Sequence, residues 1–484
     1  MLQARPVEGL SGVTPGERVE LSIRRVSVHA AFRGNQLTQS QTRWSIPPPF
    51  VMQHRSFLIA LARSFLAGEP TVDEIVARST RTMGRSWRWL RPLARRYVTA
   101  FKAETRPRVR EVIQFLLQDA GFQRAQSEHF HKLTVAQWLS EPQRMQPVEA
   151  AAGWDLPAIE TEGELAGWLE LEPGDLEWFA DLKGLLYQPA SQQLRHYRYR
   201  VLEKQSGGLR LIEAPKPRLK EIQRRILASI LDKIPPHPAV HGFVQGRSIQ
   251  TFAAPHVGRR VVLRMDLRDF FPSFPAARIQ TLFRTFGYPE TVADLLGAIC
   301  TNAAPRDVWP KPAYAERELY DRPHLPQGAP TSPALANVCT YRADCRLAGL
   351  AQSAGAVYTR YADDLAFSGD AEFERRVERF STHAAVVLME EGLTIHHRKT
   401  RVMRQGVRQH LAGLVTNRKL NVMRPDYDRL KAILTNCIRT GPATQNRDSH
   451  PEFRAHLQGR VAFVDMIQPA KGAHLQALFN QIQW

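Results

Sequence analysis

Apolar residues recur with helical spacing over the first third of the chain. The first such pattern places Phe57, Leu58, Leu61 and Phe65 on one face of a helix. Thr71 begins a capping box for the next helix, and a similar apolar pattern over residues 109–120 stops at Gly121. We therefore expect residues 51–150 to form a helical module. Residues 1–50 have little periodicity and end in a run of prolines, which favours a poorly ordered segment or linker.

The pattern changes twice more along the chain. Residues 151–194 predict a helical hairpin with a capping box at Thr161 and a turn at Pro173-Gly174. This arrangement resembles a helix-turn-helix pair, but a helix between phosphates needs positive charge and this segment is acidic, which favours a structural hairpin over a DNA-reading one. Residues 195–415 alternate short β-rich pieces with helices, and residues 416–484 return to helical spacing. The fold class is α+β.

The charge of the chain changes this picture by suggesting a partner. Lys plus Arg number 66 and Asp plus Glu number 47, a net charge of +19 that favours a nucleic acid over an acidic membrane surface. Ten of the basic residues lie between positions 79 and 110, among four aromatic residues. This stretch is either a surface for phosphate contacts and base stacking or a solvated helical face with its aromatic side buried.

Apolar runs and cysteines set limits on location and cofactors. The chain has no 18-residue apolar run and no secretory leader at its start, so we expect a cytoplasmic protein that does not enter a membrane. The four cysteines form no CxxC pair or Cys/His cluster, which supports neither a zinc site nor a disulfide framework.

Three carboxylates lie at the ends of apolar strand patterns. Asp266 ends the strand pattern VVLRMDL, and Asp363 and Asp364 lie at the tip of a strand, turn, strand hairpin in VYTRYADDLAFS. Acids packed together repel each other, and a bound Mg²⁺ would relieve that repulsion. Most Asp-Asp pairs are solvated turn residues, so the neighbouring motifs decide between the two interpretations.

Those motifs resemble the sequence blocks of reverse transcriptases. The blocks RMDLRDFFPSF, LPQGAPTSP, YADD and GLTIHHRKT occur in the order found in that family, and RYRVLEK, GFVQGRSI and YTRYADDL are similar to the bacterial retron type. The resemblance covers roughly residues 155–484. It implies a right-hand polymerase whose fingers and palm span 195–415, whose thumb spans 416–484, and which carries an added N-terminal helical module.

The resemblance also assigns the catalytic centre. It implies two Mg²⁺ ions held by Asp266, Asp363 and Asp364, with Asp364 the least direct ligand, and by the backbone carbonyl of Leu267. Lys399 matches a lysine proposed to protonate the leaving pyrophosphate, although a plain surface lysine is an equal alternative from the sequence.

Other positions match nucleotide-binding and RNA-binding residues. Phe271 matches an aromatic gate that excludes a ribose 2′-hydroxyl, with an ordinary core phenylalanine as the alternative. Gln327 and Gly328 match residues around the incoming nucleotide, and Arg210 and Lys220 are candidates for its triphosphate. The candidates for RNA contacts are Arg429, Lys431, Arg439, Arg460 and His256.

Two blocks depart from the retron pattern. Phenylalanine replaces asparagine in the block FAAPH at 252–256, and the block at 411–413 is LAG where the family has Val-Thr-Gly. Both blocks are associated with RNA handling, so His256 is either an RNA contact or a turn histidine whose hydrogen bonds are satisfied internally.

The function implied is an RNA-directed DNA polymerase that uses dNTPs. A retron enzyme would copy a structured non-coding RNA from an internal 2′-hydroxyl, give branched RNA–DNA (msDNA), and act in phage defence with an effector protein and a host RNase H. The alternatives are an abortive-infection or CRISPR-linked reverse transcriptase, or a catalytically silent RNA-binding scaffold with a polymerase fold.

Overall fold

The computed structural model describes residues 49–101, 107–139, 143–182, 184, 194–204, 208–309 and 317–484. Of the linker predicted at residues 1–50, all but the last two residues lie outside these ranges. Pro49 is the first residue of a helix, consistent with the preference of proline for the first helical turn.

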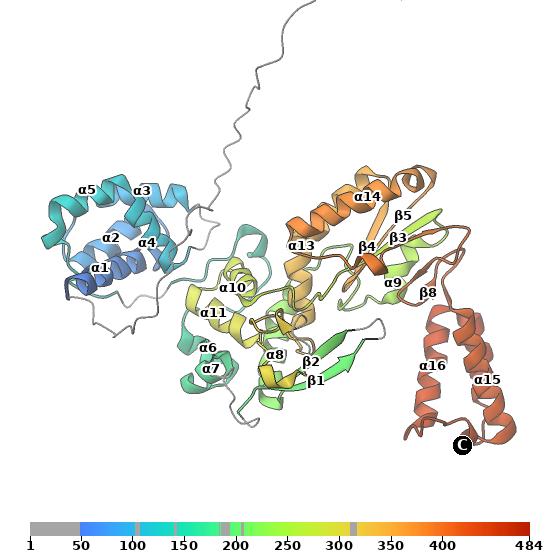
Figure 1. The fold of residues 1–484 in the computed structure, drawn as a ribbon. Coiled ribbons are helices and arrows are strands. Elements are labelled where there is room, and N and C mark those ends of the chain that lie inside the picture. Colours follow the sequence, from blue (N-terminus) through green and yellow to red (C-terminus); the bar gives the residue numbers. More distant parts are fainter. Residues whose placement is uncertain are drawn as a thin grey trace, which may run out of the picture. The chain divides into compact units, whose positions relative to one another are not determined.

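The N-terminal helices pack around their own apolar core (Figure 1). They are α1 (Pro49–Leu66), α2 (Val72–Met83), α3 (Leu90–Ala100), α4 (Val109–Gln118) and α5 (Ala120–His129). The Thr71 hydroxyl accepts a hydrogen bond from the backbone N–H of Glu74, as the capping box predicts. Trp87 contacts Trp89, and Tyr97 contacts Phe101, within or against this core. The aromatic residues therefore face inward, which favours a solvated basic face over a stacking surface.

The helix predicted to stop at Gly121 ends earlier. It stops at Gln118, and a new helix begins at Ala120. The cause is Asp119, whose carboxylate accepts a hydrogen bond from the backbone N–H of Phe122 (2.8 Å) and an ion pair from Arg96 (2.6 Å). An aspartate that satisfies the first N–H groups of a helix ends the preceding one.

The predicted acidic hairpin is present, but its turn lies elsewhere. Its helices are α6 (Glu162–Leu169) and α7 (Pro173–Ala180). Pro173 is the first residue of α7, and the chain reverses just before it, where Glu170 has a left-handed φ of 57°. The prediction of a turn at Pro173-Gly174 was wrong, because proline also suits the first turn of a helix.

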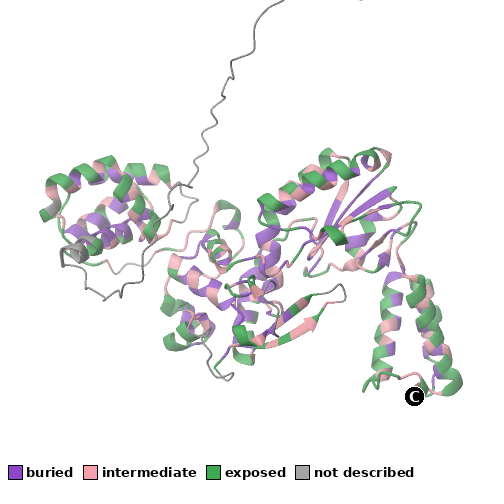
Figure 2. Ribbon diagram, viewed as in Figure 1, coloured by how far each residue is buried: buried purple, intermediate pink, exposed green. Residues whose placement is uncertain are grey.

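The middle of the chain is built on a four-stranded antiparallel sheet of order β4-β5-β3-β6. Its strands are β3 (Val261–Asp266), β4 (Val357–Tyr361), β5 (Asp364–Gly369) and β6 (Arg401–Arg404). Strands β3 and β5 are buried along most of their length (Figure 2). The buried side chains of β3 alternate between two cores. Val261 and Leu263 join the core formed with α13 (Ser332–Ser353) and α14 (Ala371–Glu390), whereas Val262 joins the core of the C-terminal helices.

A hairpin and four shorter helices accompany this sheet. They are β1 (Tyr197–Glu203), β2 (Leu209–Pro215), α8 (Pro217–Ser229), α9 (Ile249–Ala253), α10 (Ala276–Thr285) and α11 (Glu290–Ile299). The β1–β2 hairpin is antiparallel, with Tyr197 opposite Pro215. These elements agree with the alternation of strands and helices expected from residue 195 onward.

The C-terminal part is helical after a small sheet. The sheet joins β7 (His410–Leu411), β8 (Leu414–Val415) and β9 (Asn421–Val422), and the helices are α15 (Arg424–Thr440), α16 (Phe453–Ile467) and α17 (Pro469–Phe479). The LAG block supplies the two-residue turn between β7 and β8, where Ala412 and Gly413 both have positive φ. No helix of the described residues is both long enough and apolar enough to cross a membrane.

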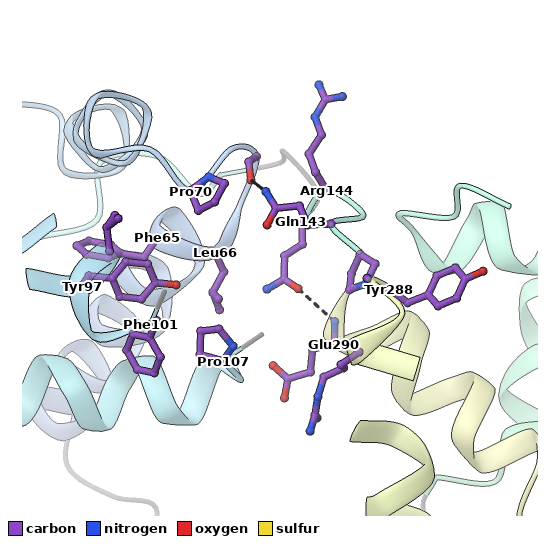
Figure 3. Close-up of a pocket in the computed structure, with 16 residues that line it drawn as sticks. Phe65, Leu66, Pro70, Tyr97, Phe101, Pro107, Gln143, Arg144, Tyr288 and Glu290 are labelled. Carbon is purple, nitrogen blue, oxygen red and sulfur yellow. Dashed lines mark hydrogen bonds between the residues drawn. The ribbon is translucent and has the colours of Figure 1, made fainter. Parts of the chain in front are cut away.

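Hydrogen bonds connect Glu290, the first residue of α11, to the start of α4 and to the segment that follows the N-terminal helices. The Glu290 carboxylate accepts from the backbone N–H of Val109 (2.8 Å), and the Glu290 N–H donates to the Gln143 side chain (3.2 Å; Figure 3). A small cavity of about 80 Å³ lies here, lined among others by Phe65 and Tyr288.

Candidate active site

The three aspartates predicted from the sequence lie at one end of the central sheet. Asp266 is the last residue of β3 and pairs in register with Asp364, the first residue of β5. Asp363 lies between β4 and β5, and its carbonyl accepts a hydrogen bond from the Leu267 N–H (2.9 Å). We call residues 361–364 the aspartate turn. The prediction that these carboxylates lie at strand ends is confirmed.

The environment of Asp363 disfavours its negative charge. Burial, together with the charges of Asp266 and Asp364, raises the pKa of Asp363 to about 6. A divalent cation would remove this repulsion and favour the ionised form. Mg²⁺ commonly uses one or two carboxylates and completes its coordination with water and substrate phosphates, so Asp266 and Asp363 suit it.

Asp364 has a different partner. The guanidinium of Arg264, two residues before Asp266 on the same strand face, donates to both carboxylate oxygens of Asp364 (2.7 and 3.0 Å). Burial raises the pKa of Asp364, and the charge of Arg264 opposes that rise. Among the described residues, no three His, Cys, Asp or Glu side chains form a group that could hold a metal ion. The structure brings all three aspartates to one end of the sheet, and their roles as metal ligands stay predictions.

Lys399 contacts Asp266 rather than extending freely from the surface. Its ammonium donates to both carboxylate oxygens of Asp266 (2.9 and 3.2 Å), and it lies in a short 3₁₀ turn, His397–Lys399, that follows the backbone bond from His396 N–H to the Asp266 carbonyl. This position suits the predicted proton donor better than the surface alternative.

Two of the predicted nucleotide-binding residues, Phe271 and Gly328, lie in different surroundings: one among aromatic rings, the other against the backbone of β2. Phe271 is half-buried and contacts the buried Phe270 and the exposed Phe243. Gly328 has a φ of 136°, and a Cβ there would lie 2.8 Å from the Glu213 carbonyl, so this close approach requires glycine.

Glu213 connects the LPQG segment to the β1–β2 hairpin. Its N–H donates to the Gln327 carbonyl (2.9 Å), and its fully buried carboxylate accepts from Asn302 (2.7 Å) and pairs with His324 (2.9 Å). Burial would lower the pKa of His324, but the charge of Glu213 and its hydrogen bond raise it above the usual value. A buried charged pair thus holds Gln327 and its neighbours against β2.

The basic candidates lie on the surface. Arg210 on β2 and Lys220 on α8 are exposed, as the predicted triphosphate contacts require. The C-terminal candidates are on α15 and α16: Arg429, Lys431 and Arg439 are exposed and Arg460 is half-exposed. Their positions are compatible with RNA contacts, which stay predictions.

His256 does not lie on a surface. It is fully buried, and its ring nitrogens form hydrogen bonds with the hydroxyls of Ser368 (2.6 Å) and Thr359 (2.7 Å). Burial lowers its pKa to about 3, so the ring is neutral. The burial favours the internally satisfied histidine over the RNA contact, since RNA could reach the ring only if the surrounding core opened.

Sequence reasoning missed a buried ion pair behind the aspartate turn. Arg360 and Asp344 are both completely buried and form two hydrogen bonds (2.8 and 2.7 Å). Arg360 also donates to the carbonyl of Ala362 (3.0 Å), which has a left-handed φ of 55°. An arginine inside an apolar strand was the available signal, because a buried charge needs a partner.

Comparison with known proteins agrees with this geometry. Residues 202–448 match the family model described as reverse transcriptase (RNA-dependent DNA polymerase). The Retron Mx65 reverse transcriptase of Myxococcus xanthus is 42% identical over 67% of this chain and 72% of its own length. The Retron Mx162 reverse transcriptase of Myxococcus xanthus is 35% identical over 69% of this chain and 70% of its own length. The Retron Ec86 reverse transcriptase of Escherichia coli is 34% identical over 49% of this chain and 69% of its own length.

Proposed function

Because the chain belongs to the retron-type reverse transcriptases and is an RNA-directed DNA polymerase, we propose that it makes branched RNA–DNA from a structured non-coding RNA. DNA synthesis starts from an internal 2′-hydroxyl of that RNA. The observation that carries the proposal is the 42% identity to a retron reverse transcriptase over 67% of the chain. Defence against phage, with an effector protein and a host RNase H, belongs to the same proposal.

The proposal divides the chain as a right hand. Residues 195–415 supply fingers and palm, and residues 416–484 supply the thumb. The N-terminal module and the acidic hairpin precede them in the sequence. The exposed basic residues of α15 and α16 bind the RNA through contacts with its phosphates.

At the catalytic centre, Asp266, Asp363 and the carbonyl of Leu267 would hold two Mg²⁺ ions, with Asp364 as a less direct ligand. Bound Mg²⁺ would supply activation of the attacking hydroxyl and charge stabilisation for the leaving pyrophosphate. Lys399 holds a proton at Nζ within 2.9 Å of Asp266 and delivers it to the leaving group.

On the nucleotide side, Phe271 packs beneath the sugar of the dNTP and leaves no room for a 2′-hydroxyl. Gln327 and Gly328 lie beside the incoming nucleotide and its template base. Arg210 and Lys220 contact the triphosphate, for which their exposure leaves them available.

The test is to express the chain with the RNA encoded beside its gene and to sequence the nucleic acid that co-purifies. We expect DNA complementary to one segment of that RNA, joined to it through a 2′–5′ bond that a debranching nuclease cleaves. The matched control is Asp363→Asn, which should carry the RNA without DNA.

DNA that starts from a free 3′-hydroxyl, or from a protein side chain, would reject retron priming and leave the polymerase activity intact. It would favour an abortive-infection or CRISPR-linked class instead.

A further inference from the structure

Phe243 combines exposure with an unfavourable backbone conformation. The residue is 49% exposed and has a left-handed φ of 61°. Bulky residues rarely adopt this conformation because it costs free energy, and an exposed ring gains little burial to offset the cost. Such strain persists where the surrounding structure imposes it and is concentrated at functional sites.

The surrounding structure that imposes it is the aspartate turn. The N–H of His241 donates to the Arg360 carbonyl (2.7 Å), and the Asn337 side chain donates to the Gly242 carbonyl (3.0 Å). A Cβ on Gly242 would lie 2.5 Å from the backbone nitrogen of Ala362. The backbone that leads into Phe243 is therefore fixed against the residues that precede Asp363.

The ring of Phe243 extends an aromatic surface beside the catalytic carboxylates. Its centroid lies 6.2 Å from that of Phe271 and 6.4 Å from that of Tyr361, and both neighbours are themselves partly exposed. Phe271 follows Asp266 by five residues, and Tyr361 precedes Asp363 by two. Three separate segments thus contribute rings to one aromatic surface next to the residues that lead into Asp363.

We propose that Phe243 packs against the last base pair of the RNA–DNA hybrid at the growing end. Aromatic rings bind nucleic acid without sequence preference because every base offers a π-face, and a polymerase must accept every base pair at this point. The proposal rests on the RNA-directed DNA polymerase activity and is independent of how synthesis is primed.

The experiment uses the full chain and a DNA primer annealed to an RNA template, with 2-aminopurine at the last primer position. The variants are Phe243→Gly and Phe243→Trp, and the control is Trp178→Ala, which removes a 42% exposed ring from α7. Affinity is measured by fluorescence anisotropy, stacking by quenching of 2-aminopurine, and folding by the melting temperature.

Phe243→Gly should weaken hybrid binding about tenfold, the size of one stacking contact, without lowering the melting temperature, because glycine adopts positive φ freely. Phe243→Trp should keep wild-type affinity and quench 2-aminopurine. Trp178→Ala should match wild type in hybrid affinity and in 2-aminopurine quenching, because its ring lies on α7.

Wild-type affinity in Phe243→Gly would overturn the proposal. The same result is expected if the ring serves only to dock a protein partner, so that role is rejected or supported by the same measurement. A melting temperature that falls together with the affinity would also overturn the proposal, because the ring would then be part of the folded core.

Discussion

Arg360→Met offers a way to separate folding from catalysis in this chain. The guanidinium is completely buried and makes four hydrogen bonds, two to Asp344 and one each to Asn337 and the Ala362 carbonyl. Removing it leaves the Asp344 carboxylate buried with the Tyr358 hydroxyl as its remaining bond. Breaking a buried ion pair in this way costs about 3–5 kcal/mol of unfolding free energy.

The double variant Arg360→Met with Asp344→Leu removes both charges. Apolar replacement of a whole buried pair is often neutral, so about 2 kcal/mol of the lost stability should return, and about 1–3 kcal/mol should stay lost because the acceptors have lost their donor. The Ala362 carbonyl stays without its donor in both variants. We therefore expect kcat to be about 100-fold lower than in wild type in both variants, because loss of this bond lets the aspartate turn shift and small displacements of reacting groups cost that much.

Stability is measured by urea unfolding followed by circular dichroism, and activity by kcat and KM for dNTP on a primed RNA template. If the double variant regains kcat together with stability, Arg360 supports only the fold. If the single variant unfolds at the wild-type urea concentration, the buried pair does not contribute as argued.

Three further predictions follow from other contacts. Because the pKa of His324 is raised in the fold, its pair with Glu213 stabilises the protein fully below pH 6.5, the ordinary histidine value, and this contribution is lost as the pH rises through the raised pKa. In wild type the urea midpoint should therefore fall as the pH rises, and His324→Gln should make that fall smaller. An unchanged fall in the variant would assign it to other groups. Phe271→Ala should lower the ratio of kcat/KM for dGTP over GTP, whereas a constant ratio would make this ring an ordinary core residue. Gly242→Ala places a Cβ 2.5 Å from a backbone nitrogen of the aspartate turn and should cost about 1–3 kcal/mol with a loss of kcat, while Gly406→Ala, with open space at its Cβ, should behave as wild type in the same assays.

The sequence was sufficient for features that depend on local pattern. Strand periodicity placed Asp266 at a strand end and Asp363 in a turn, and the capping boxes at Thr71 and Thr161 marked true helix starts. Local signals failed where one residue suits two roles. Pro173 reads as a turn but starts a helix, and Asp119 ended a helix that Gly121 was expected to end.

Contacts between distant segments could not be predicted in this way. Arg264 and Asp364 are 100 residues apart, and their pairing depends on the register of β3 against β5. His256 looked available for RNA, yet strand packing buries it against Ser368, 112 residues away. No periodicity in one sequence fixes such registers, because many pairings bury the same apolar residues.

The central claim is that Asp266 and Asp363 form the centre of an RNA-directed DNA polymerase. Its most direct test is Mg²⁺-dependent dNTP incorporation on an RNA template by wild type and Asp363→Asn, with RNA binding measured alongside. We predict that incorporation falls by orders of magnitude while RNA affinity stays at the wild-type value, because the substitution removes a ligand charge and leaves the fold intact. Extension by Asp363→Asn at a rate near that of wild type would contradict the account.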